Sequence, residues 1–481
     1  MTGETIAALA TARGTAALAV VRLSGPDAIP IVSGLFRPAD RLSAPASPHC
    51  AIGQIFDGEE PVDRVVVWLY RAPRSYTGED VVEIGCHGGC YASGRILQLL
   101  FRAGARPARE GEFTLRAFLN RKLDLAQAEA VEALIAARSA AAARAAARVL
   151  DGCLRRTLAE SVDRLSEALA LIEATLDIQE DGAPDTLSPL WEPRHPSGGR
   201  IADILDRECE VLERLLQGGR TGQMLEEGLR VVLAGRSNAG KSSLFNALLA
   251  RERAIVAPEP GTTRDFLEGW VEWDGLPIAL VDTAGLQDAT TPLEQEGIRR
   301  AREALASATL VVQVVDVKAT SAGEAAADAK QLGVPPERVV VALHKWDLGA
   351  GPDWAESASR GLGGGVCEAT GEAAAPWSPA VPSSVVAEPG VEPLRRVLLD
   401  RLHAGIGDPE ATLLVGERQR QTLARAHEAL VGARDLLARG YGGELVAFEL
   451  KQALERVGEV LGRAVGPLVL DQVFSRFCVG K

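Results

Sequence analysis

The segment from Gly235 to Ser242, GRSNAGKS, matches the G-x-x-x-x-G-K-[S/T] pattern of phosphate-binding loops. It has the required context, because the apolar run LRVVLAG precedes it and the helix-forming run SLFNALL follows it. Glycines let backbone N–H groups close around phosphates at the positive end of a helix. We expect Lys241 to reach the β- and γ-phosphates of a nucleotide and Ser242 to ligate Mg²⁺. The other loop residues predicted to contact the nucleotide are Asn238, Ala239, Gly240 and Ser243.

Further motifs follow in the order that is typical of GTPases. PGTTRD supplies Thr262 and Thr263 on a predicted switch loop, where the hydroxyl of Thr263 is expected to complete the Mg²⁺ shell. DTAG follows a predicted strand and is expected to hold Mg²⁺ through water and to sense the γ-phosphate. Its residues are Asp282, Thr283, Ala284 and Gly285.

The base-recognition motif departs from the usual pattern. HKWD stands where GTPases carry N-K-x-D, with Lys345 and Asp347 at their usual places. Asp347 could accept two hydrogen bonds from the guanine edge, which adenine cannot supply. An imidazole cannot reproduce an amide that both donates and accepts, so His344 predicts weaker discrimination of guanine. Ser384, in SSVVAEPG, lies in a degenerate version of the S-A-K element that packs on guanine.

Two positions concern how hydrolysis would be assisted. The residue after DTAG is Leu286, where Ras-like enzymes have the glutamine that orients the attacking water. Hydrolysis therefore needs another form of assistance. Asn238 occupies the place that GTPases activated by dimerisation and K⁺ use to bind that ion. A potassium ion there would neutralise developing charge, as an arginine finger does.

The elements that must position these motifs can be read from periodicity along the 481 residues, a length that suggests about three domains. Residues 1–121 mix short β-rich runs with glycine turns and predict an α+β domain. Residues 122–226 and 391–481 repeat apolar residues every three or four positions and predict an all-α domain in two segments. Residues 227–390 alternate strands and helices, which predicts an inserted α/β P-loop domain.

Composition and charge exclude several classes of protein. The chain is 47% hydrophobic and 24% charged, which is typical of a soluble globular protein. A net charge of −13 argues against a nucleic-acid coat or a binder of anionic membranes, although a local basic patch can still meet one folded RNA. Seven scattered cysteines, without an export signal or a membrane span, predict a cytoplasmic location. In CHGGC (Cys86–Cys90), a glycine turn that opens a helix is favoured over a metal site.

Taken together over the chain, the motifs resemble one family. GRSNAGKSSLFNAL, PGTTRD, DTAGL and the terminal FCVGK are similar to the bacterial tRNA-modification GTPases of the MnmE (TrmE) family, as are VVRLSGP, YTGEDVVEIGCHGG and GEFTLRAFLNRKLDLAQAEAVEALI. The similarity runs from residue 4 to the last residue, with gaps at 181–200 and 349–389. It implies an N-terminal tetrahydrofolate-binding and dimerisation domain, a helical domain in two segments and an inserted G domain.

The resemblance also implies an activity. Members of the family act as homodimers with an FAD-binding partner, MnmG (GidA), in a heterotetramer-type complex. They add a carboxymethylaminomethyl-type group at carbon 5 of the wobble uridine of certain tRNAs. The one-carbon unit comes from a tetrahydrofolate derivative in the 5-formyl or methylene form. GTP hydrolysis, accelerated as two G domains meet, drives the rearrangement, and the FAD is bound by the partner rather than by this chain.

Residue roles follow from the resemblance at matching positions. Arg22, Glu83 and Lys122 correspond to folate-contacting residues, Lys481 helps to bind the cofactor, and Cys478 is needed for modification. A pterin with a polyanionic tail needs such a mixture, because a carboxylate can accept from ring N–H groups and cations can pair with the tail.

The resemblance assigns two further roles in hydrolysis. Glu294, in LEQEGIRRA, matches the glutamate that orients the attacking water indirectly. The expected potassium ligands are Asn238, Ala257, Glu259 and Thr262, and the family's threonine at position 257 is alanine here.

The tail FCVGK allows three interpretations. As a prenylation signal it lacks an aliphatic residue at Gly480 and ends in Lys481, outside the usual set, with no polybasic run before it. It could instead be a frayed terminus. The apolar, helix-like LVLDQVFSRF ahead of it favours a tail docked on the helical domain, with no membrane involved. The alternative functions are a GTPase assembly or ribosome-associated factor without modification chemistry, and a lipid-anchored signalling GTPase.

Overall fold

The computed structural model divides the chain into two compact units. One unit comprises Met1–Glu132, Arg148–Glu213 and Arg418–Lys481, and the other comprises Ala133–Ala147 and Arg214–Glu417. The structure describes residues 3–42, 47–180, 196–250, 267–283, 299, 301–349, 354, 380–406, 413, 415–463, 466–475 and 477–481.

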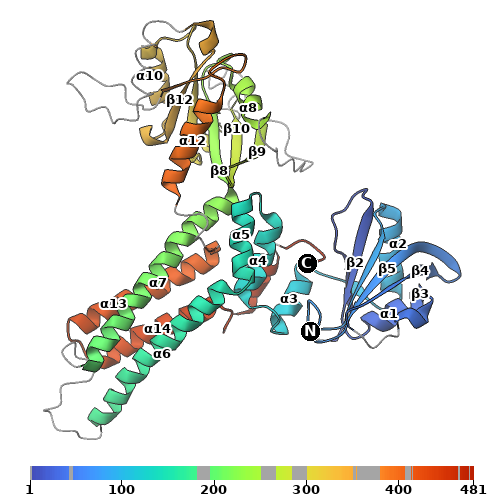
Figure 1. Ribbon diagram of the computed structural model, residues 1–481. Coiled ribbons are helices and arrows are strands. Elements are labelled where there is room, and N and C mark those ends of the chain that lie inside the picture. The colour runs from blue at the N-terminus through green and yellow to red at the C-terminus, as the bar shows by residue number, and fades with distance from the viewer. Residues whose placement is uncertain are drawn as a thin grey trace. The chain divides into compact units, whose positions relative to one another are not determined.

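The first unit contains a seven-stranded sheet in the order β3-β4-β5-β6-β2-β1-β7 (Figure 1). Its strands are β1 (Ile6–Leu9), β2 (Leu18–Ser24), β3 (Phe36–Arg37), β4 (His49–Asp57), β5 (Glu60–Tyr70), β6 (Val81–His87) and β7 (Arg106–Pro107). Neighbouring strands are antiparallel except β1 and β7. Alternate residues of the strands are buried against helices α1 (Ala28–Leu35) and α2 (Cys90–Arg102), which share one apolar core with the sheet. The 3₁₀ helix η1 spans Ala39–Leu42.

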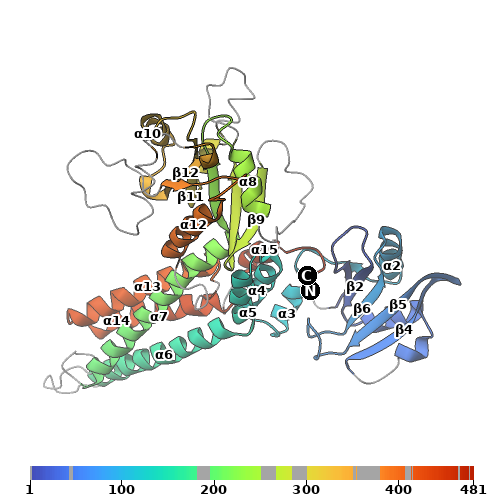
Figure 2. The ribbon, with the colours of Figure 1, turned by 45° about the horizontal axis from the view of Figure 1, so that its top comes forward.

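Helices drawn from both ends of the sequence complete the first unit. They include α3 (Glu112–Leu119), α4 (Leu125–Ala136), α6 (Cys153–Glu180), α14 (Gly443–Val460) and α15 (Pro467–Phe474). Four of the described helices have residues in both units: α4, α5 (Ala140–Leu150), α7 (Pro196–Glu227) and α13 (Glu417–Ala438). Figure 2 shows α6, α7, α13 and α14 running side by side. In α14, the buried residues Val446, Leu450, Ala453 and Val457 form the apolar stripe that periodicity predicts.

The second unit contains a six-stranded sheet in the order β13-β12-β11-β8-β10-β9. Its strands are β8 (Leu229–Ala234), β9 (Leu267–Trp273), β10 (Leu276–Asp282), β11 (Leu310–Asp316), β12 (Val339–His344) and β13 (Ala380–Pro382). All pairings are parallel except that of β9 with β10. The accompanying helices are α8 (Lys241–Ala250), α10 (Ala322–Gln331), α12 (Glu392–Gly405) and the 3₁₀ helices η2 (Pro336–Arg338) and η3 (Trp346–Leu348). The predicted combination of α+β, all-α and inserted α/β parts is therefore confirmed.

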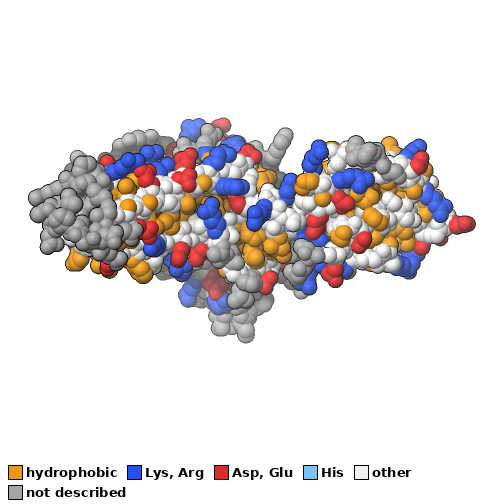
Figure 3. All heavy atoms as spheres, turned by 90° about the horizontal axis from the view of Figure 1, so that it is seen from below, with side chains coloured by type: hydrophobic (Ala, Val, Ile, Leu, Met, Phe, Trp, Pro, Cys, Tyr) orange, Lys and Arg blue, Asp and Glu red, His pale blue; other side chains and the backbone are white. Residues whose placement is uncertain are grey.

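No described helix is both long enough and apolar enough to cross a bilayer. On the face drawn in Figure 3, acidic and basic side chains are interspersed with apolar ones instead of gathering into a field of one sign.

A single glycine joins α7 to the central strand of the second sheet. Gly228 follows α7 directly, precedes β8 and has φ +80°. The indole of Trp270, in β9, lies against it so closely that a Cβ on Gly228 would be 2.3 Å from the ring atom Cζ3. The guanidinium carbon of Arg138 lies 4.0 Å from the centroid of the same indole. The joint is therefore a packed contact and leaves no room for a side chain at position 228.

We expect Gly228→Ala to destabilise the second unit more than Gly275→Ala does. Gly275 is the matched control, because its φ is +83° but nothing lies within 4 Å of an added Cβ. The control should lower the free energy of unfolding by about 1 kcal/mol, the cost of a left-handed backbone. Gly228→Ala should cost a further ~1–3 kcal/mol because the indole must move. Calorimetric unfolding of the full chain measures both, and equal losses would contradict the packed joint.

Candidate functional site

The phosphate-binding loop lies between β8 and α8, at the carboxyl end of the second sheet. The Lys241 ammonium donates to the main-chain oxygens of Gly235 and Arg236, at 3.0 Å each. Burial lowers the pKa of Lys241, whose residue is 7% exposed. Phosphate oxygens are stronger acceptors for an ammonium than these carbonyls, so the lysine can exchange them for a nucleotide.

Asp282 lies beside the first residues of α8. Its Oδ2 accepts a hydrogen bond from the Ser242 hydroxyl at 2.6 Å. Its Oδ1 is buried and has no hydrogen-bond partner among the described residues. A carboxylate with an orphaned oxygen next to a serine hydroxyl is a fitting donor set for Mg²⁺, which prefers oxygen ligands.

Three other residues predicted to contact the nucleotide, Thr283, Ala239 and Ser243, differ in how deeply they are buried. Thr283 is fully buried, and its hydroxyl donates to the main-chain oxygen of Leu233 at 2.7 Å. Ala239 is buried in the core of the unit, whereas Ser243 is exposed. Thr283 and Ala239 can therefore offer a nucleotide only their main chain.

His344 is buried, with only 1% of its surface exposed. Its Nδ1 lies 3.2 Å from the Ser383 hydroxyl, and its ring packs against Gly240 of the phosphate-binding loop. Burial and the neighbouring charge of Lys345 lower the pKa of His344, so the imidazole is neutral at pH 7. Sequence reasoning missed Ser383, for which adjacency to Ser384 was the available signal.

The rest of the base-recognition motif is tied to two other loops. Lys345 donates to the main-chain oxygen of Asn238 at 3.0 Å and to Asp316 at 2.6 Å. Asp347 accepts a hydrogen bond from the Ser384 hydroxyl at 2.5 Å, which orients its carboxylate. The structure thus brings together three predicted parts of the site: the phosphate-binding loop, the HKWD motif and Ser384.

Several predicted residues lie outside the described part of the chain, so their roles stay predictions: Ala257, Glu259, Thr262, Thr263, Ala284, Gly285, Leu286 and Glu294.

A second group forms where the C-terminal tail docks within the first unit. Val479 pairs with Glu110 in an isolated antiparallel bridge. The main-chain N–H of Phe113, in the first turn of α3, donates to the main-chain oxygen of Lys481 at 3.1 Å. Arg22 donates to the main-chain oxygen of Gly480 at 3.4 Å. These contacts agree with a docked tail rather than a frayed end.

The docked tail brings three of the predicted folate residues together with the thiol. Arg22, in β2, forms an ion pair of 2.7 Å with Glu83, in the neighbouring strand β6. Burial lowers the pKa of Lys481, the Arg22 charge lowers it further, and Glu83 and Cys478 oppose these effects. The Cys478 residue itself is exposed.

Lys122 is the remaining predicted folate residue, and its role stays a prediction. Its ammonium donates to the main-chain oxygen of Pro73 at 3.1 Å and makes no hydrogen bond to Arg22, Glu83 or Lys481 among the described residues. Sequence reasoning missed the aromatic walls of the site: the guanidinium carbon of Arg22 lies 5.4 Å from the ring centroid of Tyr76 and 5.7 Å from that of Phe113. Their presence in YTGED and GEFTLRAF was the available signal.

Comparison with known proteins covers the whole chain. Residues 5–122 match the family model of the GTP-binding protein TrmE N-terminus, and residues 125–478 match that of the MnmE helical domain. The tRNA modification GTPase MnmE of Symbiobacterium thermophilum is 43% identical over 481 residues, which covers 99% of each chain. That of Moorella thermoacetica is 40% identical over 492 residues and covers 100% of each. The solved G domain of the T. maritima FeoB iron transporter is 26% identical over 36% of this chain and 99% of its own, with a TM-score of 0.27, too low to carry an argument.

We expect Gly480→Ala to release the docked tail. Gly480 has φ +105°, and an added Cβ would lie 2.3 Å from the main-chain oxygen of Leu9, which cannot move aside as a side chain can. Hydrogen exchange should become faster in the peptides that contain residues 477–481 and Phe113. The matched control is Gly466→Ala, because Gly466 has φ −71° and open space around it. Equal exchange in the two variants would contradict the docking.

Proposed function

The chain belongs to the MnmE family of tRNA modification GTPases, and from that premise we propose that it modifies carbon 5 of the wobble uridine of certain tRNAs together with an FAD-binding partner protein. It is a GTPase, and the family implies GTP and Mg²⁺. The proposed product is a carboxymethylaminomethyl-type group, the proposed one-carbon donor is a tetrahydrofolate derivative, and the proposed assembly contains a homodimer of this chain.

The observation that carries this proposal is the group at the docked tail. A GTPase without modification chemistry has no need for an exposed thiol, Cys478, beside the Lys481 amine and the Arg22–Glu83 pair. The mixture of two cations and one carboxylate suits a reduced folate, whose ring offers N–H donors and whose glutamate tail is anionic. Tyr76 and Phe113 add apolar faces to the same group.

In the nucleotide half, each described residue has a defined task. Lys241 would leave the loop carbonyls for the β- and γ-phosphates, and Asp347, oriented by Ser384, would accept hydrogen bonds from the guanine edge. Ser242 and Asp282 would hold Mg²⁺, whose charge neutralises the phosphates when it is bound. Glu294 would orient the attacking water, and K⁺ would lie at Asn238 with the main chain of the following loop.

In the folate half, Glu83 would accept from pterin N–H groups while Arg22 and Lys481 pair with carboxylates of the cofactor. The Cys478 thiol would either add to the activated pyrimidine ring or assist the one-carbon transfer. The exposed position of Cys478 leaves the thiol accessible to a substrate as large as tRNA.

We expect GTP turnover to be severalfold faster in KCl than in NaCl at matched ionic strength. The reason is the absence of a catalytic glutamine at Leu286 together with an asparagine at position 238, which is exposed. Asn238→Ala should remove the difference between the salts. Steady-state phosphate release measures all four rates, and equal wild-type rates would disprove the potassium assignment.

We expect Cys478→Ser to abolish tRNA modification while GTP hydrolysis and folding stay as in the wild type, because the hydroxyl is a far weaker nucleophile than a thiolate. Cys90→Ser is the matched control, since Cys90 is also exposed in the same unit but lies at the start of α2. Modification is assayed on tRNA with the flavoprotein partner present.

Full modification by Cys478→Ser would refute the chemical role of the thiol. A wild-type chain that hydrolyses GTP but neither binds 5-formyl-tetrahydrofolate nor supports modification would refute the proposed function as a whole.

A further inference from the structure

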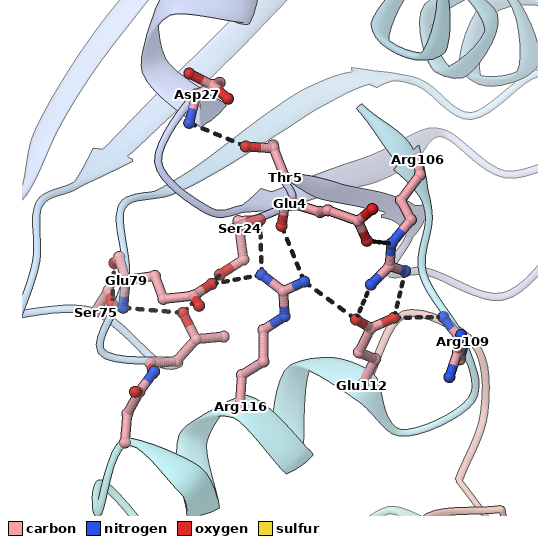
Figure 4. Close-up of polar contacts among 12 residues, drawn as sticks. Glu4, Thr5, Ser24, Asp27, Ser75, Glu79, Arg106, Arg109, Glu112 and Arg116 are labelled. Carbon is pink, nitrogen blue, oxygen red and sulfur yellow. Dashed lines mark hydrogen bonds and ion pairs between the residues drawn. The ribbon is translucent and has the colours of Figure 1, made fainter. Parts of the chain in front are cut away.

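A buried arginine joins the segments that surround the group formed by Arg22, Glu83, Cys478 and Lys481, here called the tail site. Arg116, in α3, is only 5% exposed. Its guanidinium donates to Glu79 at 2.8 Å, to Glu112 at 3.1 Å and to the main-chain oxygens of Glu4 at 3.0 Å and Ser24 at 3.4 Å (Figure 4). One planar group thus contacts the 73–79 loop, the first turn of α3, the end of β2 and Glu4, two residues before β1.

Glu112, the partner of Arg116 in α3, also accepts hydrogen bonds from Arg106 and Arg109. Glu112 accepts two hydrogen bonds from Arg106, at 2.6 and 2.8 Å, and one from the main-chain N–H of Arg109 at 2.9 Å. Burial alone would raise the pKa of Glu112, but these donors and Arg116 lower it to about 2. The carboxylate is therefore charged throughout the physiological range, and Arg116 always has this partner.

The carboxylate on the loop side is held in the same way. Glu79 accepts a hydrogen bond from the Ser24 hydroxyl at 2.7 Å, and that hydroxyl also lies 2.7 Å from the Thr77 hydroxyl. Asn120, just after α3, donates to the main-chain oxygen of Thr77 at 2.7 Å. The loop is thereby attached to α3 twice, through Glu79 at Arg116 in the last turn of the helix and through Thr77 at Asn120 just after its end.

The two segments that Arg116 joins carry the two aromatic walls of the neighbouring site. Tyr76 lies in the loop and Phe113 in the first turn of α3, and the Arg22 guanidinium is in contact with both rings. The Tyr76 hydroxyl lies 2.9 Å from that of Thr114, so the walls are also linked directly. Phe113 in addition donates its main-chain N–H to Lys481. A shift of α3 relative to the loop would therefore move Arg22 and the tail together.

We propose that Arg116 is the positioning residue of the tail site: by holding Glu79 and Glu112 at once, it sets the spacing between the Tyr76 loop and α3, and through it the placement of Arg22 and of the docked tail. The folate-related part of this inference rests on the proposed function, whereas the docking part does not. Lysine cannot replace Arg116, because a single ammonium on a flexible stem lacks the planar fork that donates in several fixed directions.

The experiment compares full-length Arg116→Lys with the wild type, and uses Arg95→Met as the matched control. Arg95, in α2, is ion-paired with Asp57 in the same unit but belongs to neither segment. Three quantities are measured: hydrogen exchange of the peptides with residues 477–481 and Phe113, the Kd for 5-formyl-tetrahydrofolate, and GTP turnover. Arg116→Lys should speed exchange in both peptides and raise the Kd about tenfold, with turnover unchanged. The control should change none of them.

A double variant separates positioning from general stabilisation. If Arg116 acts through Arg22 and the docked tail, Arg116→Lys should raise the Kd for the folate by a smaller factor in the Arg22→Met background than in the wild type, because the two effects share part of one path. Additive losses would overturn the inference, as would faster exchange across the whole first unit. Should Arg116→Lys fold poorly, Glu79→Gln removes only the charge on the loop side and should give the same local pattern.

The outcomes also distinguish the two proposals. If the wild type binds no folate but Arg116→Lys still releases the tail, the proposed function fails and the positioning role stands. If the wild type binds the folate and Arg116→Lys changes neither the Kd nor the exchange, the positioning role fails and the proposed function stands.

Discussion

The grouping of residues at the docked tail depends on one main-chain contact, the pairing of the tail with the start of α3. Arg22 and Glu83 already face each other across β2 and β6, but Lys481 and Cys478 join them only because Val479 pairs with Glu110 and Lys481 accepts from Phe113. Main-chain hydrogen bonds can form with almost any side chain, so most positions of the tail need no particular residue type. The exception is the residue that lies very close to another backbone. That residue is Gly480, which lies against the Leu9 carbonyl.

The nucleotide half is assembled by a different constraint, the direction of parallel strands. The phosphate-binding loop follows β8, Asp282 ends β10, and His344 ends β12. Because the carboxyl ends of parallel strands meet at one edge of a sheet, strand order alone brings these residues together. The hydrogen bonds between Lys345 and Asn238 and between Ser242 and Asp282 then link loops that strand order has already placed side by side.

This difference explains what the sequence could predict. The fold class and the nucleotide motifs could be predicted, because each motif sits beside its own strand or helix and carries its context with it. The grouping at the tail came only from family resemblance, since periodicity and spacing say nothing about a pairing between residues 110 and 479. Arg116 and Ser383 lie within the quoted stretches GEFTLRAF and SSVVAEPG, but they act through partners distant in sequence, so neither was found. Lys122 was also predicted from the resemblance, and its role in folate binding stays a prediction, since the structure shows only that its ammonium donates to the Pro73 carbonyl.

The second unit contains helical residues in addition to the predicted inserted domain of residues 227–390. Leu225 at the end of α7 and Ala141 in α5 belong to the same apolar core as the strands of the sheet. In β10, Asp282 ends the strand, and Ala279 pairs with Trp270, whose indole covers Gly228. The strand that Asp282 ends is therefore connected to the end of α7 by direct packing through Trp270 and Gly228. The helical residues of this unit therefore share one apolar core with the strands that carry the nucleotide site.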